Sequence, residues 1–343
     1  MITTRALNRA TLARQLLLQR QKIKLVDAVE RLAGLQAQVP KPPAIGLWSR
    51  VEAFSLDAYR QSLAKRELVR ATLMRGTIHL VSRRDFVAWR PAIQPVLTAA
   101  AGQITKGSID VDATLKAARG FLGKKSAIFE EIRQHLVGQF PGAHDRFLGY
   151  AVRMYLPLVM VPDASPYGFP PNSEFALADS FLGEAIAADA GAHDLALRYL
   201  AAFGPATVAD FQTWSGLKGA KPLFEELRPK LVTFADKKRE LFDLPDAPRP
   251  DEESEAPVRF LPEFDNLLLA HADRGRIISE GFRPRVVTKN LRVLATFLVD
   301  GFVAGTWSIE KKKLVLEPFV KLTKKVSDAL QAEGEELVKL FTK

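Results

Sequence analysis

The sequence predicts a mainly α-helical protein with short antiparallel strands, an α+β class, in which tandem winged-helix units precede a β-rich C-terminal part. Three observations support this class. The first 64 residues show helical apolar spacing, a β-branched segment follows them, and the same helix–strand order returns twice further along. At 343 residues the chain has room for about two or three hydrophobic cores. The order of elements carries the prediction, since no clear motif repeats.

The first winged-helix unit is expected within residues 1–120. Helices are predicted from apolar periodicity over 7–20, 25–38, 44–49 and 56–64. Prolines at 40, 42 and 43 stop the second helix. Residues 68–81 are rich in β-branched and aliphatic side chains, and Arg75-Gly76 provides a turn between two short runs. Helices followed by such a hairpin are typical of a winged helix, in which the hairpin is the wing.

The same order of elements predicts two further units, over residues 121–190 and 191–245. In the second unit, helices are expected over 126–137 and 144–154, and strands over 156–162 and 174–177. In the third unit, the expected helices cover 193–203, 207–215 and 220–228, and the expected strands cover 231–235 and 240–244. We therefore expect three helix–hairpin units in succession.

The last part, residues 246–343, differs from these units. Residues 243–257 hold six acidic residues and four prolines, which indicates an exposed linker or long loop. Alternating segments then predict antiparallel strands over 293–299, 303–308 and 313–317, before a closing helix over 320–341. This part is expected to be a β-rich domain with a terminal helix.

Composition excludes several classes of site. The chain has no cysteine, so disulfides, thiolate nucleophiles and cysteine-bound metals are ruled out. The five histidines are scattered without metal-binding spacing, so we expect neither a metal nor another cofactor. No apolar run reaches the length of a membrane span, and the N-terminal residues do not resemble a secretory signal. We expect a cytoplasmic, nucleoid-associated location.

Charge is concentrated in two places. The net charge of +10 favours polyanionic partners, but basic charge alone is weak evidence for nucleic acid. Residues 60–90 contain eight basic and two acidic residues, and they straddle the predicted wing. Residues 274–292 contain six basic residues and one acidic residue. These patches favour contact with phosphates, and the alternative is two solvated faces with scattered ion pairs.

The segment Leu35–Gln38 contains two glutamines, Gln36 and Gln38, whose side-chain amides lie two positions apart in the sequence. Side chains at positions i and i+2 of an ideal helix diverge by about 200°, so they do not share a target there. The prolines that follow predict a frayed helix end, where both amides point into one groove. Taken alone, the pattern fits equally two glutamines at a helix end whose side chains are exposed to solvent and have no function.

Three segments of the chain resemble signature segments of the AlkZ/YcaQ winged-helix DNA glycosylases. They are GLQAQ at 34–38, RATLMRGTIHLVSRRD at Arg70–Asp85, and LPEFDNLLLAHADRGRII at Leu261–Ile278, in the order and at separations similar to the family's. The resemblance implies three winged-helix units and a β-rich part forming a concave DNA-binding body. It also implies excision of N7-alkylated purines and, in some members, unhooking of interstrand crosslinks. Gln36 and Gln38 match the Gln-x-Gln form of the catalytic motif, which belongs to the AlkZ-like branch.

The implied chemistry suits two amides. An N7-alkylated purine already carries positive charge, so its glycosidic bond is predisposed to break, and the enzyme chiefly has to orient a water. A neutral glutamine also avoids the free-energy cost of burying a carboxylate. No lysine is needed, so the reaction is expected to be monofunctional hydrolysis. The expected partner is double-stranded DNA containing alkylated bases, bound by a monomer with no obligate protein partner.

The same segments provide the residues expected to contact DNA. They are Arg70, Arg75, Thr77, His79, Arg83, Arg84, His271, Asp273, Arg274 and Arg276. Arg274 and Arg276 are the expected backbone anchors, and a histidine within a strand, such as His79, also fits a structural role. The alternative is a winged-helix protein without catalysis, such as a transcription regulator; an RNA-binding or chromatin-associated protein would use the same patches.

Overall fold

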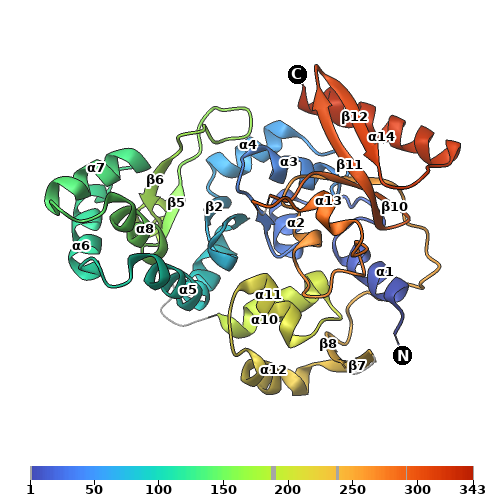
Figure 1. Ribbon diagram of the computed structural model, residues 1–343, viewed down its shortest axis with the longest axis horizontal. Helices are drawn as coiled ribbons and strands as arrows, with labels where there is room; N and C mark the ends of the chain where they lie inside the picture. Colours follow the sequence, from blue (N-terminus) through green and yellow to red (C-terminus); the bar gives the residue numbers. More distant parts are fainter. Residues whose placement is uncertain (1, 187–190, 237–238, 291, 343) are drawn as a thin grey trace. The chain divides into compact units, whose positions relative to one another are not determined.

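The computed structural model describes residues 2–186, 191–236, 239–290 and 292–342 (Figure 1). It divides into two compact units. Unit 1 comprises Met1–Ser55, Ala196–Trp214 and Gly219–Lys343, and unit 2 comprises Leu56–Leu195 and Ser215–Lys218. The two ends of the chain therefore share a unit. The division into four parts expected from the sequence stays a prediction, and its boundary at residue 190 lies outside the described residues.

Unit 1 begins with three helices and a short strand: α1 (Thr4–Arg14), α2 (Leu25–Arg31), β1 (Leu35–Gln36) and α3 (Lys41–Trp48). The Thr3 side chain caps α1 by accepting a hydrogen bond from the Ala6 backbone N–H. The helix ends at Arg14, earlier than predicted, because Leu16 adopts a positive φ of 57°.

The middle of unit 1 has the element order of a winged helix. Helices α10 (Ala192–Phe203), α11 (Val208–Ser215) and α12 (Lys221–Leu227) precede the hairpin of β7 (Val232–Asp236) and β8 (Arg239–Asp243). Ala206, between α10 and α11, forms an antiparallel bridge with Phe242 of β8. The helices and the hairpin expected in this region are confirmed.

The C-terminal part of unit 1 is an antiparallel sheet with a helix packed on it. Strands β9 (Arg259–Leu261), β10 (Thr296–Val299), β11 (Phe302–Glu310) and β12 (Lys313–Pro318) pair in the order β12-β11-β10-β9. The short helix α13 (Arg283–Val286) lies between β9 and β10 in the sequence, and α14 (Lys324–Phe341) packs against β9 and β12. The β-rich C-terminal part with its closing helix is confirmed.

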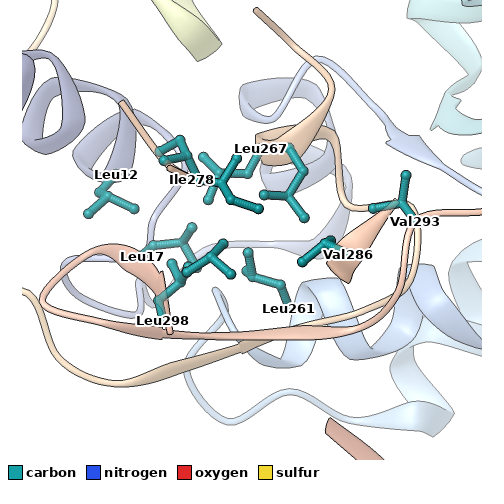
Figure 2. Packing of buried hydrophobic residues seen from close by; sticks show 11 residues of the cluster. Leu12, Leu17, Leu261, Leu267, Ile278, Val286, Val293 and Leu298 are labelled. Carbon is teal, nitrogen blue, oxygen red and sulfur yellow. The ribbon is translucent and has the colours of Figure 1, made fainter. Parts of the chain in front are cut away.

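One hydrophobic cluster joins the two ends of the chain inside unit 1 (Figure 2). Leu12 and Leu17 come from the N-terminal segment, whereas Leu261, Leu267 and Leu298 come from the C-terminal part, and each is at most 2% exposed. Burying such side chains contributes about 1.5–3 kcal/mol each. The cluster holds the loop between β9 and Leu267 against the N-terminal segment.

Unit 2 combines helices with a second antiparallel sheet. Its elements are α4 (Leu56–Ala64), β2 (Leu68–Thr72), β3 (Ile78–Ser82), α5 (Arg83–Thr105), α6 (Val111–Leu122), β4 (Ala127–Ile128), α7 (Phe129–Gln139), α8 (Asp145–Tyr155), β5 (Leu158–Met160), β6 (Glu174–Leu177) and α9 (Ala178–Leu182). The strands of this unit pair in the order β3-β2-β5-β6-β4. The predicted hairpin over 68–81 is confirmed as β2 and β3, and its turn places Arg75 at a φ of 57°. From α6 to β6 the winged-helix order appears again, with β4 paired to β6.

The sequence did not predict α5 and α6. Pro91 and Pro95 lie inside α5, where proline normally interrupts a helix. The helix nevertheless continues for 23 residues, with Trp89, Ile93 and Leu97 fully buried. Among the helices of the described residues, none is both long and apolar enough to cross a membrane.

Candidate active site

Helix α2 ends before the glutamine pair, which corrects the predicted helix over 25–38. The Gly34 backbone N–H donates to the Val29 carbonyl at 2.9 Å, and the Ala33 N–H donates to the Glu30 carbonyl at 3.1 Å. Ala33 and Gly34 have φ values of 53° and 81°. This pattern is a Schellman C-cap, in which left-handed backbone ends the helix. The chain then continues as the strand β1.

The backbone around the two amides is not helical. Side chains at i and i+2 of a regular strand point to the same face, but the strand here ends at Gln36, before Gln38. Gln36 lies in β1 and is 8% exposed, and Gln38 is exposed in the bend that leads to α3. Pro40 caps α3, and Pro42 occupies an early position that needs no backbone N–H. The local structure therefore holds Gln36 on a short strand and Gln38 in the bend after it, between two helices, and neither amide belongs to a frayed helix end.

A small cavity of about 10 Å³ lies beside Gln36. Such a volume holds about one water molecule. Its polar lining comes from three distant parts of unit 1, namely Gln15, Gln36, Arg50, Glu263, Asp265 and Asn266.

The loop that contains Asp265 and Asn266 fixes the strand that carries Gln36. Asp265 Oδ1 accepts hydrogen bonds from Arg50 Nη2 at 2.9 Å and from the Leu267 backbone N–H at 3.0 Å. Asn266 Nδ2 donates to the Gly34 carbonyl at 3.2 Å, directly before β1. These hydrogen bonds order the loop and connect it to the strand that carries Gln36. Arg50 gave no sequence signal, because its partner is 215 residues away.

Helix α3 approaches β1 closely at Gly46. A Cβ built on this glycine would lie 2.9 Å from Leu35 Cδ2, and 3.5 Å from both Pro262 Cγ and Arg50 Nη1. A larger side chain would therefore push against the strand that carries Gln36 and against the loop that follows β9.

A larger cavity of about 260 Å³ adjoins the first, and the two share Pro42, Pro262 and Glu263. Its remaining lining is mostly apolar and comes from the segment after Gln38, from α3, from the residue before β10 and from β11: Val39, Lys41, Ile45, Ala295, Trp307, Ser308 and Ile309. The Trp307 ring is fixed by its Nε1–H, which donates to the Leu261 carbonyl at 2.9 Å. Val39 is 42% exposed, so it adds apolar surface at the edge of this cavity.

In unit 2 the structure separates the expected DNA contacts by burial. Arg70 is 4% exposed and lies over the Phe169 ring, and burial lowers its pKa to about 10. His79 is fully buried, and burial together with the nearby Arg75 lowers its pKa to about 3. These two side chains therefore have structural surroundings, and we do not retain them as DNA contacts. The side chains of the other four expected contacts in this unit are partly or fully exposed to solvent: Arg75, Thr77, Arg83 and Arg84.

The second set of expected contacts divides in the same way within unit 1. His271 is 1% exposed, and its Nε2 lies 3.0 Å from the Phe203 carbonyl; Arg276 is 6% exposed and donates to the Pro205 carbonyl at 2.9 Å. Burial lowers the pKa of both groups. Because they are enclosed by their own unit, neither is retained as a DNA contact. Two residues of this set remain accessible to solvent. Asp273 is exposed and paired with Arg239, and Arg274 is half-buried.

Comparison with known proteins adds to this geometry. A protein-family model described as DNA glycosylase AlkZ-like matches residues 29–340. An interstrand DNA cross-link repair glycosylase from Streptomyces sahachiroi is 24% identical over 352 residues, which cover 95% of this chain and 93% of that protein. The solved structure of Streptomyces sahachiroi DNA glycosylase AlkZ matches with a TM-score of 0.81 at 21% identity, over 99% of this chain and 96% of the other. This last likeness shows a common fold.

Proposed function

Because the chain belongs to the AlkZ-like DNA glycosylase family, we propose that it hydrolyses the N-glycosidic bond of N7-alkylated purines in double-stranded DNA. In this proposal, Gln36 and Gln38 hold the attacking water. The observation that carries it is their placement in one short non-helical segment between α2 and α3, with Gln36 in β1 and Gln38 in the bend that follows.

The reaction needs little acid–base help from the protein. The bond between C1′ and N9 breaks, and its electron pair neutralises the positive charge of the alkylated purine. The water oxygen forms the new bond to C1′, and a proton is released to solvent. The products are the free alkylated base and an abasic site. The amide oxygens orient the water by accepting its hydrogen bonds, and they do not remove the proton.

Exposure assigns different parts to the two amides. The exposed Gln38 is open to a DNA substrate, and the nearly buried Gln36 is held by its surroundings. A fixed acceptor beside an accessible one restricts the position of a shared water, which lowers the entropic cost of reaching the transition state.

The larger cavity favours bulky adducts as a second substrate class. It shares Pro42 with the small cavity that Gln36 lines, and it is lined by Val39, the residue that follows Gln38. Its lining is mainly apolar. We propose that it receives the apolar part of a bulky N7 substituent. The relative from Streptomyces sahachiroi bears the name of a cross-link repair glycosylase, which agrees with a substrate larger than a methyl group.

The Ser308→Trp variant tests the role of this cavity, because Ser308 is exposed on β11 and lines it. The larger ring fills the space without touching the glutamine pair. Excision of a bulky N7 adduct should fall by about tenfold relative to N7-methylguanine. Lys313→Trp on the neighbouring strand is the matched control, and it should change neither rate. An equal effect of Ser308→Trp on both substrates would contradict the subsite.

The side chains with exposed surface remain the proposed DNA contacts: Arg75, Thr77, Arg83, Arg84, Asp273 and Arg274. Arg83 is paired with Glu184, and Asp273 is paired with Arg239, so both would have to exchange these partners on binding. Arg84 and Arg274 are the proposed phosphate contacts, because arginine at a protein surface binds phosphate oxygens well.

Release of a free base tests the proposed function. Duplex DNA containing N7-methylguanine is incubated with the protein, and the products are separated by chromatography. The proposal expects free N7-methylguanine and an equal amount of abasic sites, with no release of guanine from unmodified duplex. Tight binding without release, from methylated, bulky and cross-linked duplexes alike, would instead support a non-catalytic DNA-binding protein.

A further inference from the structure

We propose that the small cavity beside Gln36 is a binding site for one buried water, and that Asp265 uses this water to position the Gln36 amide. The water site stands on the structure alone. The role of Asp265 as a positioning residue rests on the function proposed above. Asp265 touches neither the substrate nor the attacking water in this proposal.

The first argument is a carboxylate oxygen that lacks a partner. The Asp265 side chain is 2% exposed, and Oδ1 accepts from Arg50 Nη2 and from the Leu267 N–H. Within the described residues, Oδ2 of the same carboxylate is buried and accepts no hydrogen bond. A buried acceptor that is left unsatisfied destabilises the folded protein, and more so when it is charged. A donor at this oxygen would remove that destabilisation.

The second argument is the size and lining of the cavity. A volume of about 10 Å³ has room for one water and for little else. A buried water typically makes about three hydrogen bonds to polar groups. Besides Asp265, the amides of Gln15, Gln36 and Asn266 line the cavity. The site therefore combines room for one water with enough polar partners.

The water would set the orientation of the Gln36 amide. It donates one hydrogen to Asp265 Oδ2, because a carboxylate only accepts. Its own oxygen is then best used as an acceptor of the Gln36 Nε2–H. The NH₂ group and the oxygen of an amide lie on opposite sides, so the Gln36 oxygen turns away from the cavity, where it accepts from the attacking water. This arrangement also explains glutamine at position 36, because a glutamate there would offer no donor and would add a further negative charge beside Asp265.

A crystal structure of the wild-type protein at a resolution that shows ordered waters tests the site itself. We expect one water peak within hydrogen-bond distance of both Asp265 Oδ2 and the Gln36 side-chain nitrogen. An empty cavity, or a water bonded only to other groups, would overturn the proposal. This result does not depend on any activity, so it is separate from the proposed function.

Two variants test the positioning role by single-turnover excision. Asp265→Asn replaces the acceptor with a donor, which favours the wrong orientation of the Gln36 amide, and the excision rate should fall by about tenfold while DNA affinity stays within about twofold. Asp243→Asn is the matched control: Asp243 also forms a fully buried ion pair, with Arg14, away from the cavity. It should change neither rate nor affinity for the folded protein.

A double variant separates positioning from a merely structural effect. In Gln36→Glu combined with Asp265→Asn, positions 36 and 265 again hold one carboxylate and one amide, and the donor and the acceptor have changed places. The double variant should excise about tenfold faster than Gln36→Glu alone. If the two effects add, so that the double variant is slower than either single one, the positioning role is overturned. If the wild-type protein releases no base from any N7-alkylated duplex, the proposed function fails and with it the role of Asp265, whereas the water peak still decides the site.

Discussion

Arg50 and Asp265 form a buried ion pair, with Arg50 Nη2 2.9 Å from Asp265 Oδ1 and side-chain exposures of 1% and 2%. The remaining guanidinium nitrogens donate to the carbonyls of Gln15 at 3.1 Å and Gly46 at 2.9 Å. One side chain thus connects the end of α1, helix α3 and the loop after β9. That loop in turn holds the carbonyl of Gly34, next to the strand that carries Gln36.

Removing the cation of this pair should destabilise unit 1. Arg50→Met leaves the Asp265 carboxylate buried without its counter-ion, and loss of one partner of a buried pair costs about 3–5 kcal/mol. Urea unfolding should show this decrease in the free energy of unfolding. The control is Arg60→Met, which breaks the exposed pair with Asp57 and should leave the transition unchanged. Equal decreases in the free energy of unfolding for the two variants would contradict a larger contribution of the buried pair to stability.

The two glutamines should differ in their tolerance of a negative charge. Gln38→Glu places a carboxylate on an exposed side chain, where it stays hydrated and still accepts from a water. Gln36→Glu places it at an 8% exposed position that shares a cavity with Asp265. Excision of N7-methylguanine should fall by about tenfold or more for Gln36→Glu and by clearly less for Gln38→Glu. The reverse order would show that burial does not separate the roles of the two amides.

The basic segment 274–292 should contribute to binding through its exposed arginines. Arg283 at the start of α13 is exposed, and Arg283→Gln removes one charge that can neutralise a phosphate. Binding to duplex DNA should weaken, and the slope of log K against log salt concentration should become shallower by about 0.9. Arg228→Gln serves as a control, because Arg228 is already paired with Glu225 and Glu240. An unchanged slope for Arg283→Gln would remove Arg283 from the interface.

Two buried histidines should make stability depend on pH. Burial, with Arg75 nearby, lowers the pKa of His79 to about 3; burial also lowers the pKa of His271, with Arg276 nearby. In the unfolded chain each imidazole takes up a proton near pH 6.5, whereas the folded protein keeps it neutral. The free energy of unfolding should therefore fall as the pH drops below about 6.5, by about 1.4 kcal/mol per pH unit for each histidine.

Unfolding by urea between pH 7 and pH 5 measures this dependence. His79→Gln should flatten it, because one buried imidazole is lost. His144→Gln is the comparison at an exposed histidine, whose side chain is 60% exposed. A dependence that is the same in all three proteins would show that another group controls the acid sensitivity.

Much of the secondary structure could be predicted because its causes are local. The hairpin at 68–82 follows from β-branched segments with turn residues between them, and β7 and β8 lie within one residue of the predicted strands. The end of α2 could not be predicted, since apolar spacing continued through residue 38 while Ala33 and Gly34 adopted left-handed backbone. Helix α5 was not predicted because it contains two prolines. Its buried face stabilises the helix despite them.

The candidate site could be predicted only in part. The pattern of Gln36 and Gln38 acquired meaning from flanking segments that resemble a known family, whereas the short strand and the bend that hold the two residues came from the structure. Arg50 and Asp265 are far apart in the sequence, so no local pattern connects them. Burial of Arg70, His79, His271 and Arg276 depends on tertiary packing in the same way, and a count of basic residues does not reveal it.

The central claim is that Gln36 and Gln38 act on the chemical step of base excision. Single-turnover release of N7-methylguanine from duplex DNA, measured for the wild-type protein and for Gln36→Ala and Gln38→Ala with DNA affinity determined in parallel, tests it most directly. The account predicts that both variants bind DNA within about twofold of the wild-type protein and release base at least about a hundredfold more slowly. Wild-type rates in both variants, or a loss of release that follows a matching loss of affinity, would contradict it.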